Sequence, residues 1–262
     1  MIGIGIDIGS TAAKAAVVDG GGSVAWTCVQ PTGFSSVDAA ERLRGELAAA
    51  GYDVAADDVR VIATGYGRVA VPYAHKVVTE ITCHGTGAVR LFGDHGTVID
   101  VGGQDTKVIQ IKGGRVAKFA MNDKCAAGTG RFYEAMARSF EMTLPEFSNL
   151  SLGAKNVIPI TAQCTVFAES EVITLVGEGK PMDEIAAGIQ MAVAKRCFVM
   201  AKKAGATDSI TLTGGCAKNA GLKQAIEHVL KLKVIDLKTD PQLMGALGAA
   251  EYARQKGLSK GV

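Results

Sequence analysis

The sequence predicts an α/β protein made of two similar domains. Three observations support this fold class: one glycine-rich hairpin pattern occurs twice, helical and extended segments alternate along the chain, and 33 of the 262 residues are glycine. Alternation of helices and strands is typical of α/β folds, and a glycine excess indicates many tight turns. We expect a first domain over residues 1–97, completed by a C-terminal helix at 242–256, and a second domain over 98–241.

The repeated hairpin opens each expected domain. Its first copy has an apolar strand at 2–7, a turn at 9–11 and a return strand at 15–18. The second copy, with strands at 98–101 and 108–111, lies 93 residues later (100 minus 7). Such self-similarity indicates a duplicated structural unit. The identical residues are Asp7 and Asp100, Gly9 and Gly102, Lys14 and Lys107, and Gly20-Gly21 and Gly113-Gly114.

The remaining elements follow from apolar periodicity and from turn residues. A helix is expected at 37–50, directly after Ser35-Ser36, because serine caps helix N-termini. A long helix is expected at 181–204, because proline suits the first turn of a helix. The other expected helices cover 80–89, 131–140, 220–230 and 242–255, and the other expected strands cover 59–63, 157–160 and 209–212.

Composition argues against several classes of function. Lys and Arg number 28 and Asp and Glu number 26, a formal net charge of +2, and these charges are scattered. We therefore expect no nucleic-acid partner and no anionic membrane surface. The most apolar long segment, 185–204, is interrupted by Gln190, Lys195 and Arg196, so no membrane span is expected either. Because no basic leader or cleavage site is recognisable, we expect a cytoplasmic protein.

The two hairpin turns have the residue types of phosphate-binding loops. A strand that ends in Asp-x-Gly-Ser-Thr brings backbone N–H groups together where no Cβ blocks a ligand. Asp7 and Asp100, just before the turns, are suited to hold Mg²⁺ through its water shell, because Mg²⁺ uses few protein carboxylates. Lys14 adds a positive charge near the first turn.

A third glycine site, Gly214-Gly215, ends the strand at 209–212 and precedes the helix at 220–230, where an adenosine could lie against bare backbone. The chain contains neither a Walker loop nor a dinucleotide fingerprint after a strand. The order of the three turns resembles the actin, sugar-kinase and Hsp70-type ATPase superfamily. This resemblance implies ATP or ADP in a cleft between the two domains. The candidate nucleotide contacts are Gly9, Ser10, Thr11, Ala12, Ala13, Lys14, Gly102, Gly103, Gly214, Gly215 and Asn219.

Six widely spaced cysteines do not suggest a disulfide framework, so each is a buried thiol, a reactive thiol or a metal ligand. Cys125 lies in a small-residue loop before the helix at 131–140, and Cys164 lies between the strand at 157–160 and a helix start. A helix N-terminus favours the thiolate form. The others, Cys28, Cys83, Cys197 and Cys216, are interpreted as buried thiols.

Cys125 and Cys164 are the candidate metal ligands. No Cys-x-x-Cys pair occurs, which excludes a local zinc ribbon. A cubane iron–sulfur cluster normally takes four thiolates, and one chain supplies two. A twofold homodimer would supply the other two, so we expect one [4Fe-4S] cluster on the dimer axis.

Five segments together resemble the activators (component A) of 2-hydroxyacyl-CoA dehydratases. That family includes the ATP-binding subunits of benzoyl-CoA reductase and the reductases of double-cubane-cluster proteins. The resemblance covers nearly the whole chain, and the two cysteine segments are its most specific part. The sequence departs from the family pattern at Cys216, where an apolar residue is expected. The five segments are 7–11, 100–105, 122–131, 164–171 and 213–215.

The resemblance implies a homodimer with one bridging [4Fe-4S] cluster and one ATP site per subunit, which passes single low-potential electrons to a partner. The electron donor would be ferredoxin or flavodoxin, and the acceptor an iron–sulfur dehydratase or a double-cubane-cluster protein. In this interpretation Asp7 and Asp100 manage Mg²⁺ and the attacking water, and Gln104 positions that water.

Two other functions fit the glycine turns. One is a small-molecule kinase of the same fold, similar to pantothenate kinase, and the other is a non-catalytic module that binds ATP to set its conformation. Both leave Cys125 and Cys164 unexplained.

Overall fold

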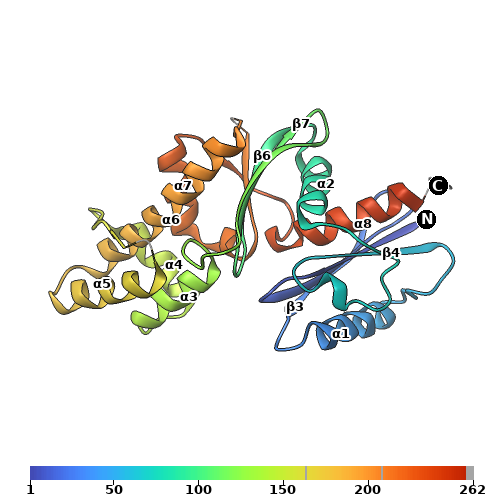
Figure 1. Ribbon diagram of the computed structural model, residues 1–262, viewed down its shortest axis with the longest axis horizontal. Coiled ribbons are helices and arrows are strands. Elements are labelled where there is room, and N and C mark those ends of the chain that lie inside the picture. Colours follow the sequence, from blue (N-terminus) through green and yellow to red (C-terminus); the bar gives the residue numbers. More distant parts are fainter. Residues whose placement is uncertain (163, 208, 258–262) are drawn as a thin grey trace. The chain divides into compact units, whose positions relative to one another are not determined.

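The computed structural model describes residues 1–162, 164–207 and 209–257 and contains two compact units. Unit 1 comprises residues 1–95, 111–117 and the chain from Leu237 onward, and unit 2 comprises 96–110 and 118–236. Each unit has a five-stranded sheet with helices packed against it, so the predicted α/β class is confirmed (Figure 1). None of the described helices is both long enough and apolar enough to cross a membrane.

The sheet of unit 1 has the strand order β3-β2-β1-β4-β5. Its central strand β1 pairs antiparallel with β2, which confirms the first predicted hairpin, and parallel with β4. The apolar run of β1 is buried from Gly3 to Ile8, as expected for a strand covered on both faces. The strands are β1 (Ile2–Ile8), β2 (Ala12–Val18), β3 (Val24–Pro31), β4 (Val59–Thr64) and β5 (Lys76–Val77).

The two faces of β1 pack against different helices. Ile4 and Ile6 share a core with Leu43 of helix α1 (Ser36–Ala49). This helix begins one residue before the predicted start, because Ser35 is its N-cap: the Ser35 side chain accepts a hydrogen bond from the N–H of Asp38.

The other face of β1 consists of glycines and lies against helix α8 (Met244–Gly257). A Cβ at Gly5 would lie only 1.9 Å from the Ala246 carbonyl oxygen, and one at Gly3 only 2.1 Å from that of Ala250. Helix α2 (Glu80–Phe92) packs beside α8 (Figure 1), where a Cβ at Gly248 would lie 1.7 Å from the Cys83 oxygen. These glycines therefore allow the backbones of α8, β1 and α2 to approach closely.

Unit 2 repeats this arrangement with the strand order β10-β9-β6-β7-β8, in which β6 is parallel to β9. The aromatic side chains of Phe132, Tyr133 and Phe147 are fully buried in its core. The strands are β6 (His95–Val101), β7 (Thr106–Lys112), β8 (Val116–Asn122), β9 (Ile210–Thr213) and β10 (Val234–Ile235), and the helices are α3 (Gly130–Ser139), α4 (Leu144–Leu150), α5 (Thr165–Gly177), α6 (Met182–Ala204) and α7 (Ala220–Leu230).

One predicted strand is wrong. Residues 157–160 have no strand partner and run as an irregular segment along α6. The N–H of Ile158 donates to the Glu184 carbonyl at 3.1 Å, and a Cβ at Gly188 would lie 1.8 Å from the Ile158 oxygen. Pro159 also lacks the N–H that a strand would use. Helix α6 therefore binds this segment where the prediction placed a sheet.

Strands β3, β5, β8 and β10 and helix α4 are not among the predicted elements. Helix α4 has a recognisable sequence signal, because Thr143 and Glu146 form a capping box around Pro145 in its first turn. The N–H of Thr143 donates to the Glu146 carboxylate at 2.8 Å.

The glycine face of β1 gives a prediction about stability. Gly5→Ala should lower the free energy of unfolding by about 1–3 kcal/mol or more, because its methyl group would overlap the backbone of α8. Gly45→Ala is the control: Gly45 lies in α1, and apart from its chain neighbours and the backbone of its own helix, nothing lies within 4 Å of the position that a Cβ would take there. This change should raise the free energy of unfolding by about 0.5–1 kcal/mol. Urea unfolding measures both, and an unchanged Gly5→Ala protein would contradict the packing.

Candidate functional site

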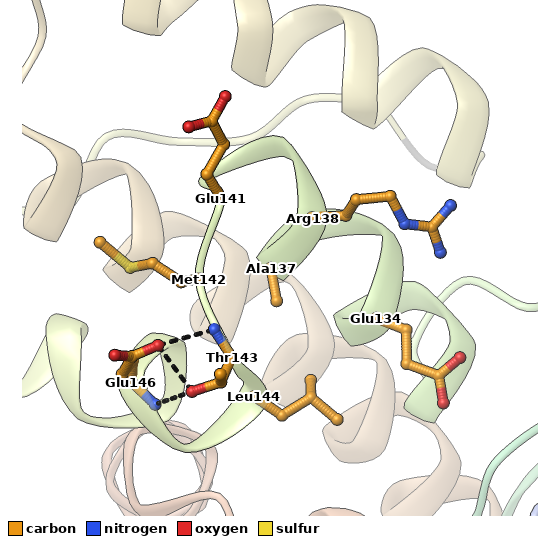
Figure 2. A pocket seen from close by; sticks show the side chains of 8 residues that line it. All are labelled: Glu134, Ala137, Arg138, Glu141, Met142, Thr143, Leu144 and Glu146. Atoms are coloured by element: carbon orange, nitrogen blue, oxygen red, sulfur yellow. Dashed lines mark hydrogen bonds between the residues drawn. The ribbon is translucent and has the colours of Figure 1, made fainter.

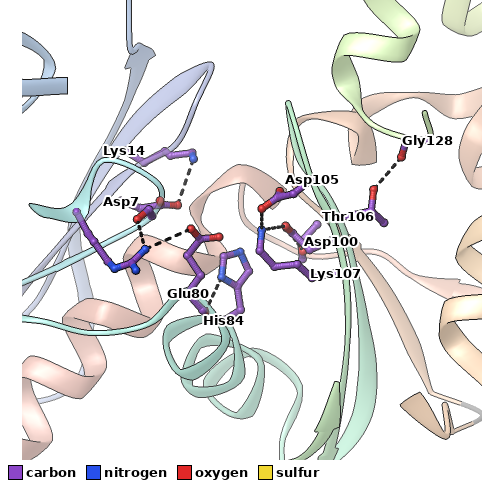
Figure 3. Close-up of polar contacts among 12 residues, drawn as sticks. Asp7, Lys14, Glu80, His84, Asp100, Asp105, Thr106, Lys107 and Gly128 are labelled. Atoms are coloured by element: carbon purple, nitrogen blue, oxygen red, sulfur yellow. Dashed lines mark hydrogen bonds and ion pairs between the residues drawn. The ribbon is translucent and has the colours of Figure 1, made fainter. Parts of the chain in front are cut away.

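The first phosphate turn lies between β1 and β2. It is closed by a hydrogen bond from the Gly9 N–H to the Ala12 carbonyl at 3.0 Å. Asp7 precedes it on β1, and Lys14 follows on β2 with its Nζ 3.1 Å from the Asp7 carboxylate (Figure 3). Ser10 is partly exposed and Thr11 is exposed, so ligand atoms can reach this turn.

The second phosphate turn has the same construction in unit 2. Its Gly102 N–H donates to the Asp105 carbonyl at 2.9 Å, and each of these positions is 93 residues after its counterpart in the first turn. The buried Lys107 lies 3.5 Å from the Asp100 carboxylate and 2.7 Å from that of Asp105 (Figure 3). Asp105 is therefore an ion-pair partner of a lysine, while Gln104 at the tip of the turn is exposed.

The duplication also includes a third strand in each unit, β4 and β9, which the repeat recognised in the sequence does not cover. Gly65 follows β4 and Gly214 follows β9, both with left-handed backbone (φ +90° and +82°). A Cβ at Gly65 would lie 2.5 Å from the Ile8 oxygen, and one at Gly214 would lie 2.4 Å from the oxygen of Val101. In both units a glycine therefore packs against the carbonyl that follows the aspartate. In the sequence, this equivalence is marked by the dipeptide Thr-Gly, which occurs at 64–65 and at 213–214.

The predicted adenosine turn leads into α7 as expected. Gly214 is followed by a short 3₁₀ segment (Gly215–Lys218), and Asn219 caps α7 by accepting from the N–H of Leu222 at 2.9 Å. The same Asn219 oxygen also accepts from the Gln190 amide at 3.1 Å. Beside this turn, Thr213 donates to the Asp100 carboxylate at 2.7 Å. Unit 2 therefore brings Asp100 and Gly214 together.

Arg68, Glu80 and His84 form a polar cluster beside Asp7, which the sequence analysis does not predict. Glu80 and His84 lie on α2, where Nδ1 of the buried His84 is 2.9 Å from the Glu80 carbonyl oxygen (Figure 3). Gly245 of α8 lies between Asp7 and His84, since a Cβ at position 245 would be 2.7 Å from Asp7 Oδ2 and 3.0 Å from His84 Cε1. The Arg68 guanidinium lies 4.0 Å from the Glu80 carboxylate.

The cysteines fall into two groups. Cys125 and Cys164 are exposed, whereas Cys83, Cys197 and Cys216 are buried. Cys28, which the sequence analysis interprets as buried, is half-buried. Burial raises the pKa of Cys83, Cys197 and Cys216 to about 12. These three are therefore neutral thiols near pH 7, as the sequence predicts.

The two exposed cysteines have different settings. Cys164 is the N-cap residue of α5, as predicted, and its carbonyl accepts from the N–H of Ala168 at 2.9 Å. Cys125 lies in the loop before α3, as predicted: α3 begins at Gly130, one residue before the predicted start, and a turn separates it from Cys125. The Asn122 side chain holds this loop by donating to the Cys125 carbonyl at 3.0 Å.

Within the described ranges, no three His, Cys, Asp or Glu side chains gather into a metal site. A shallow pocket of about 500 Å³ lies between α3 and α4 (Figure 2), but none of the predicted site residues lines it. The predicted residues instead divide between the units, with Asp7 and 9–14 in unit 1 and the others in unit 2.

Comparison with known proteins gives consistent matches. The sequence profile of the BadF/BadG/BcrA/BcrD ATPase family matches residues 4–253. Component A of the (R)-2-hydroxyglutaryl-CoA dehydratase of Acidaminococcus fermentans superposes with a TM-score of 0.92, at 37% identity, over 99% of this chain and 100% of that one. The activator of the 2-hydroxyisocaproyl-CoA dehydratase of Clostridium difficile, solved with bound ADPNP, gives a TM-score of 0.86 at 37% identity, over 100% of this chain and 99% of that one.

A more distant match concerns the fold alone. A ROK-family glucokinase of Streptomyces griseus superposes with a TM-score of 0.60 at 17% identity, over 97% of this chain and 100% of that one. The predicted fold of the actin, sugar-kinase and Hsp70 ATPase type is confirmed.

The two groups of cysteines should differ in reactivity. In iron-free native protein, iodoacetamide at pH 8 should label Cys125 and Cys164 and spare Cys83, Cys197 and Cys216, because only the thiolate reacts and the buried thiols have raised pKa values. Peptide mass spectrometry measures the labelling, and urea-unfolded protein, which should label at all positions, is the control. Equal labelling of Cys197 and Cys125 in the native protein would contradict the assigned burial.

Proposed function

The chain belongs to the BadF/BadG/BcrA/BcrD ATPase family, and from this we propose that it hydrolyses ATP to drive single electrons into a partner dehydratase or reductase. Two of its structural relatives are named as a dehydratase activator and a dehydratase component. In this proposal each chain binds one nucleotide, and two copies of the chain share one iron–sulfur cluster.

The duplicated turn is the observation that supports nucleotide binding. Both copies combine a strand-end aspartate, an adjacent lysine and a turn in which a glycine N–H closes the loop. Backbone N–H groups and nearby lysines are the groups that hold phosphates. The relative from Clostridium difficile, solved with ADPNP, adds to this support.

Hydrolysis requires a water oxygen to attack the γ-phosphorus while the bond to the β-phosphate oxygen breaks, which yields ADP and phosphate. We assign the orientation of that water to Gln104, whose side chain is exposed at the second turn. Asp7 and Asp100 would hold the waters of Mg²⁺, and this ion would neutralise charge on the phosphate oxygens. Lys14 is the better placed phosphate ligand of the two lysines, because Lys107 is buried between two carboxylates.

The exposed thiols fit a shared [4Fe-4S] cluster. Thiolates are its usual ligands and four are needed, so Cys125 and Cys164 of two copies form a complete set. The cluster, when bound, stores one electron and passes it on. A ferredoxin or a flavodoxin would supply that electron, and an iron–sulfur dehydratase or a double-cubane-cluster protein would accept it.

A small-molecule kinase is the second candidate, favoured by the fold shared with the glucokinase. It gives no role to two exposed cysteines. The two candidates differ in the fate of the γ-phosphoryl group, which goes to water in one and to an alcohol in the other.

Iron content tests the cluster. Protein isolated without oxygen should contain about four irons per two chains, and Cys125→Ser or Cys164→Ser should remove them. Cys197→Ser is the control and should keep the iron, because Cys197 is buried. Iron-free wild-type protein after anaerobic reconstitution would refute the cluster.

ATP turnover tests the nucleotide site. Gln104→Ala should slow Mg²⁺-dependent hydrolysis by about 100-fold and leave ADP binding intact, because only the orienting group is lost. Asp7→Asn should also reduce turnover. Phosphate release and ADP titration measure these effects. Wild-type turnover in both variants would refute the assignments, and a phosphorylated alcohol as product would favour the kinase.

A further inference from the structure

The second phosphate turn is bonded directly to the start of α3, the helix that follows the Cys125 loop. The N–H of Gly130 donates to the Gly102 carbonyl at 2.8 Å, and the N–H of Arg131 donates to the Gly103 carbonyl at 2.8 Å. A Cβ at Gly130 would lie only 3.1 Å from the Gly103 Cα, so the two backbones are in contact. The turn and the helix start therefore cannot move independently without breaking these bonds.

Thr106 adds a side-chain bond to the same junction. It is the first residue of β7, directly after the turn, and is buried. Its hydroxyl donates to the Gly128 carbonyl at 2.7 Å (Figure 3). Gly128 lies in the Cys125 loop and has left-handed backbone (φ +87°). Thr106 thus joins the strand that leaves the phosphate turn to the loop that presents the cysteine.

The loop between Cys125 and Gly128 is itself held by polar contacts. The Asn122 amide donates to the carbonyls of Cys125 and Ala127, at 3.0 and 3.4 Å. The Thr129 hydroxyl donates to the Ala126 carbonyl at 2.6 Å. A displacement at Gly128 is therefore passed to Cys125 rather than absorbed between them.

Unit 1 lacks this arrangement, although it has the same turn. There the Gly9 carbonyl accepts from the Thr32 hydroxyl at 2.7 Å, and residues 32–35 lead directly from β3 to α1. In unit 2 the corresponding connection, between β8 and α3, runs over 123–129 and contains Cys125. The position equivalent to Thr106 (106 minus 93) is Ala13, which has no hydroxyl. The bond is therefore specific to the unit with the exposed cysteines.

We propose that Thr106 is the positioning residue that makes the exposure of Cys125 depend on the nucleotide at the second phosphate turn. The inference rests on the proposed nucleotide site but not on the cluster. Phosphates bound at the second phosphate turn fix that turn, the Thr106 hydroxyl fixes Gly128 relative to it, and the loop fixes Cys125.

The test compares four full-length proteins in the iron-free state, with folding checked by circular dichroism. The alkylation rate of Cys125 is measured by peptide mass spectrometry without nucleotide and with saturating Mg²⁺ and ADPNP. Binding of ADPNP to each protein is titrated separately, so that rates are compared at saturation. In the wild type, nucleotide should change the Cys125 rate by about fivefold or more, the range of ordinary coupling between sites.

Thr106→Val removes the hydroxyl and keeps the branched shape, so nucleotide should change its Cys125 rate by less than about twofold. Thr106→Ser keeps a hydroxyl and should restore the wild-type response. Thr97→Val is the matched control, because Thr97 is also buried on the same sheet but bonds to Thr207, away from the cysteine loop. It should respond like the wild type.

A full response in Thr106→Val, or a response lost equally in Thr97→Val, would overturn the proposal. Absence of any response in the wild type would do the same. If Thr106→Val does not fold, Thr106→Ala takes its place, because it also removes the hydroxyl and alanine is the residue at the equivalent position 13 of unit 1. A wild-type response in Thr106→Ala would then overturn the proposal.

The outcomes of this test can be distinguished from those of the iron-content test. Protein that binds no iron but shows the Thr106-dependent response would refute the cluster and keep this inference. Protein that contains about four irons per two chains but shows no nucleotide response at Cys125 would support the cluster and refute this inference. In iron-loaded protein the rate of iron loss to a chelator gives a second readout, which Thr106→Val should make independent of nucleotide.

Discussion

Both units depend on one close contact, in which a glycine after a parallel strand packs on the carbonyl that follows an aspartate. Gly65 contacts the Ile8 carbonyl in unit 1, and Gly214 contacts the Val101 carbonyl in unit 2. Any side chain at either glycine would push the neighbouring strand away. The contact therefore fixes where each aspartate ends its strand and where each glycine turn begins, and the polar network around each turn is built from that point.

The two copies have diverged in charge. In unit 1 the carboxylate of Asp7 pairs with Lys14, whereas in unit 2 the buried Lys107 lies between the carboxylates of Asp100 and Asp105. A buried lysine needs compensating charge, because desolvation of an unpaired cation is costly. The second carboxylate supplies it. Lys107 of unit 2 therefore pairs with two carboxylates, and its counterpart Lys14 is paired with that of Asp7.

The sequence predicted the parts of the fold that local patterns determine. The hairpins, the helix start at Ser35 and the cap at Cys164 follow from residues close in sequence. The segment at 157–160 looked like a strand because it is apolar, but its conformation depends on a distant contact, the approach of Ile158 to Gly188. The equivalence of Gly65 and Gly214 also depends on distant contacts. In the sequence only the dipeptide Thr-Gly is shared, and the equivalence becomes clear from the contact that each glycine makes with the strand beside it.

The glycine face of β1 also has a consequence for the order of folding during synthesis. β1 is made before the other described strands, yet the helix that covers its Gly3 and Gly5 face is α8, which follows all of those strands in the sequence. Until α8 is made, the central strand of unit 1 stays bare on one side, whereas every strand and helix that lies wholly in unit 2 precedes α8 in the chain. Nascent chains generally fold domain by domain from the N-terminus. Here the unit that begins first is the one completed last, so a stalled or truncated chain would expose an apolar sheet face to aggregation.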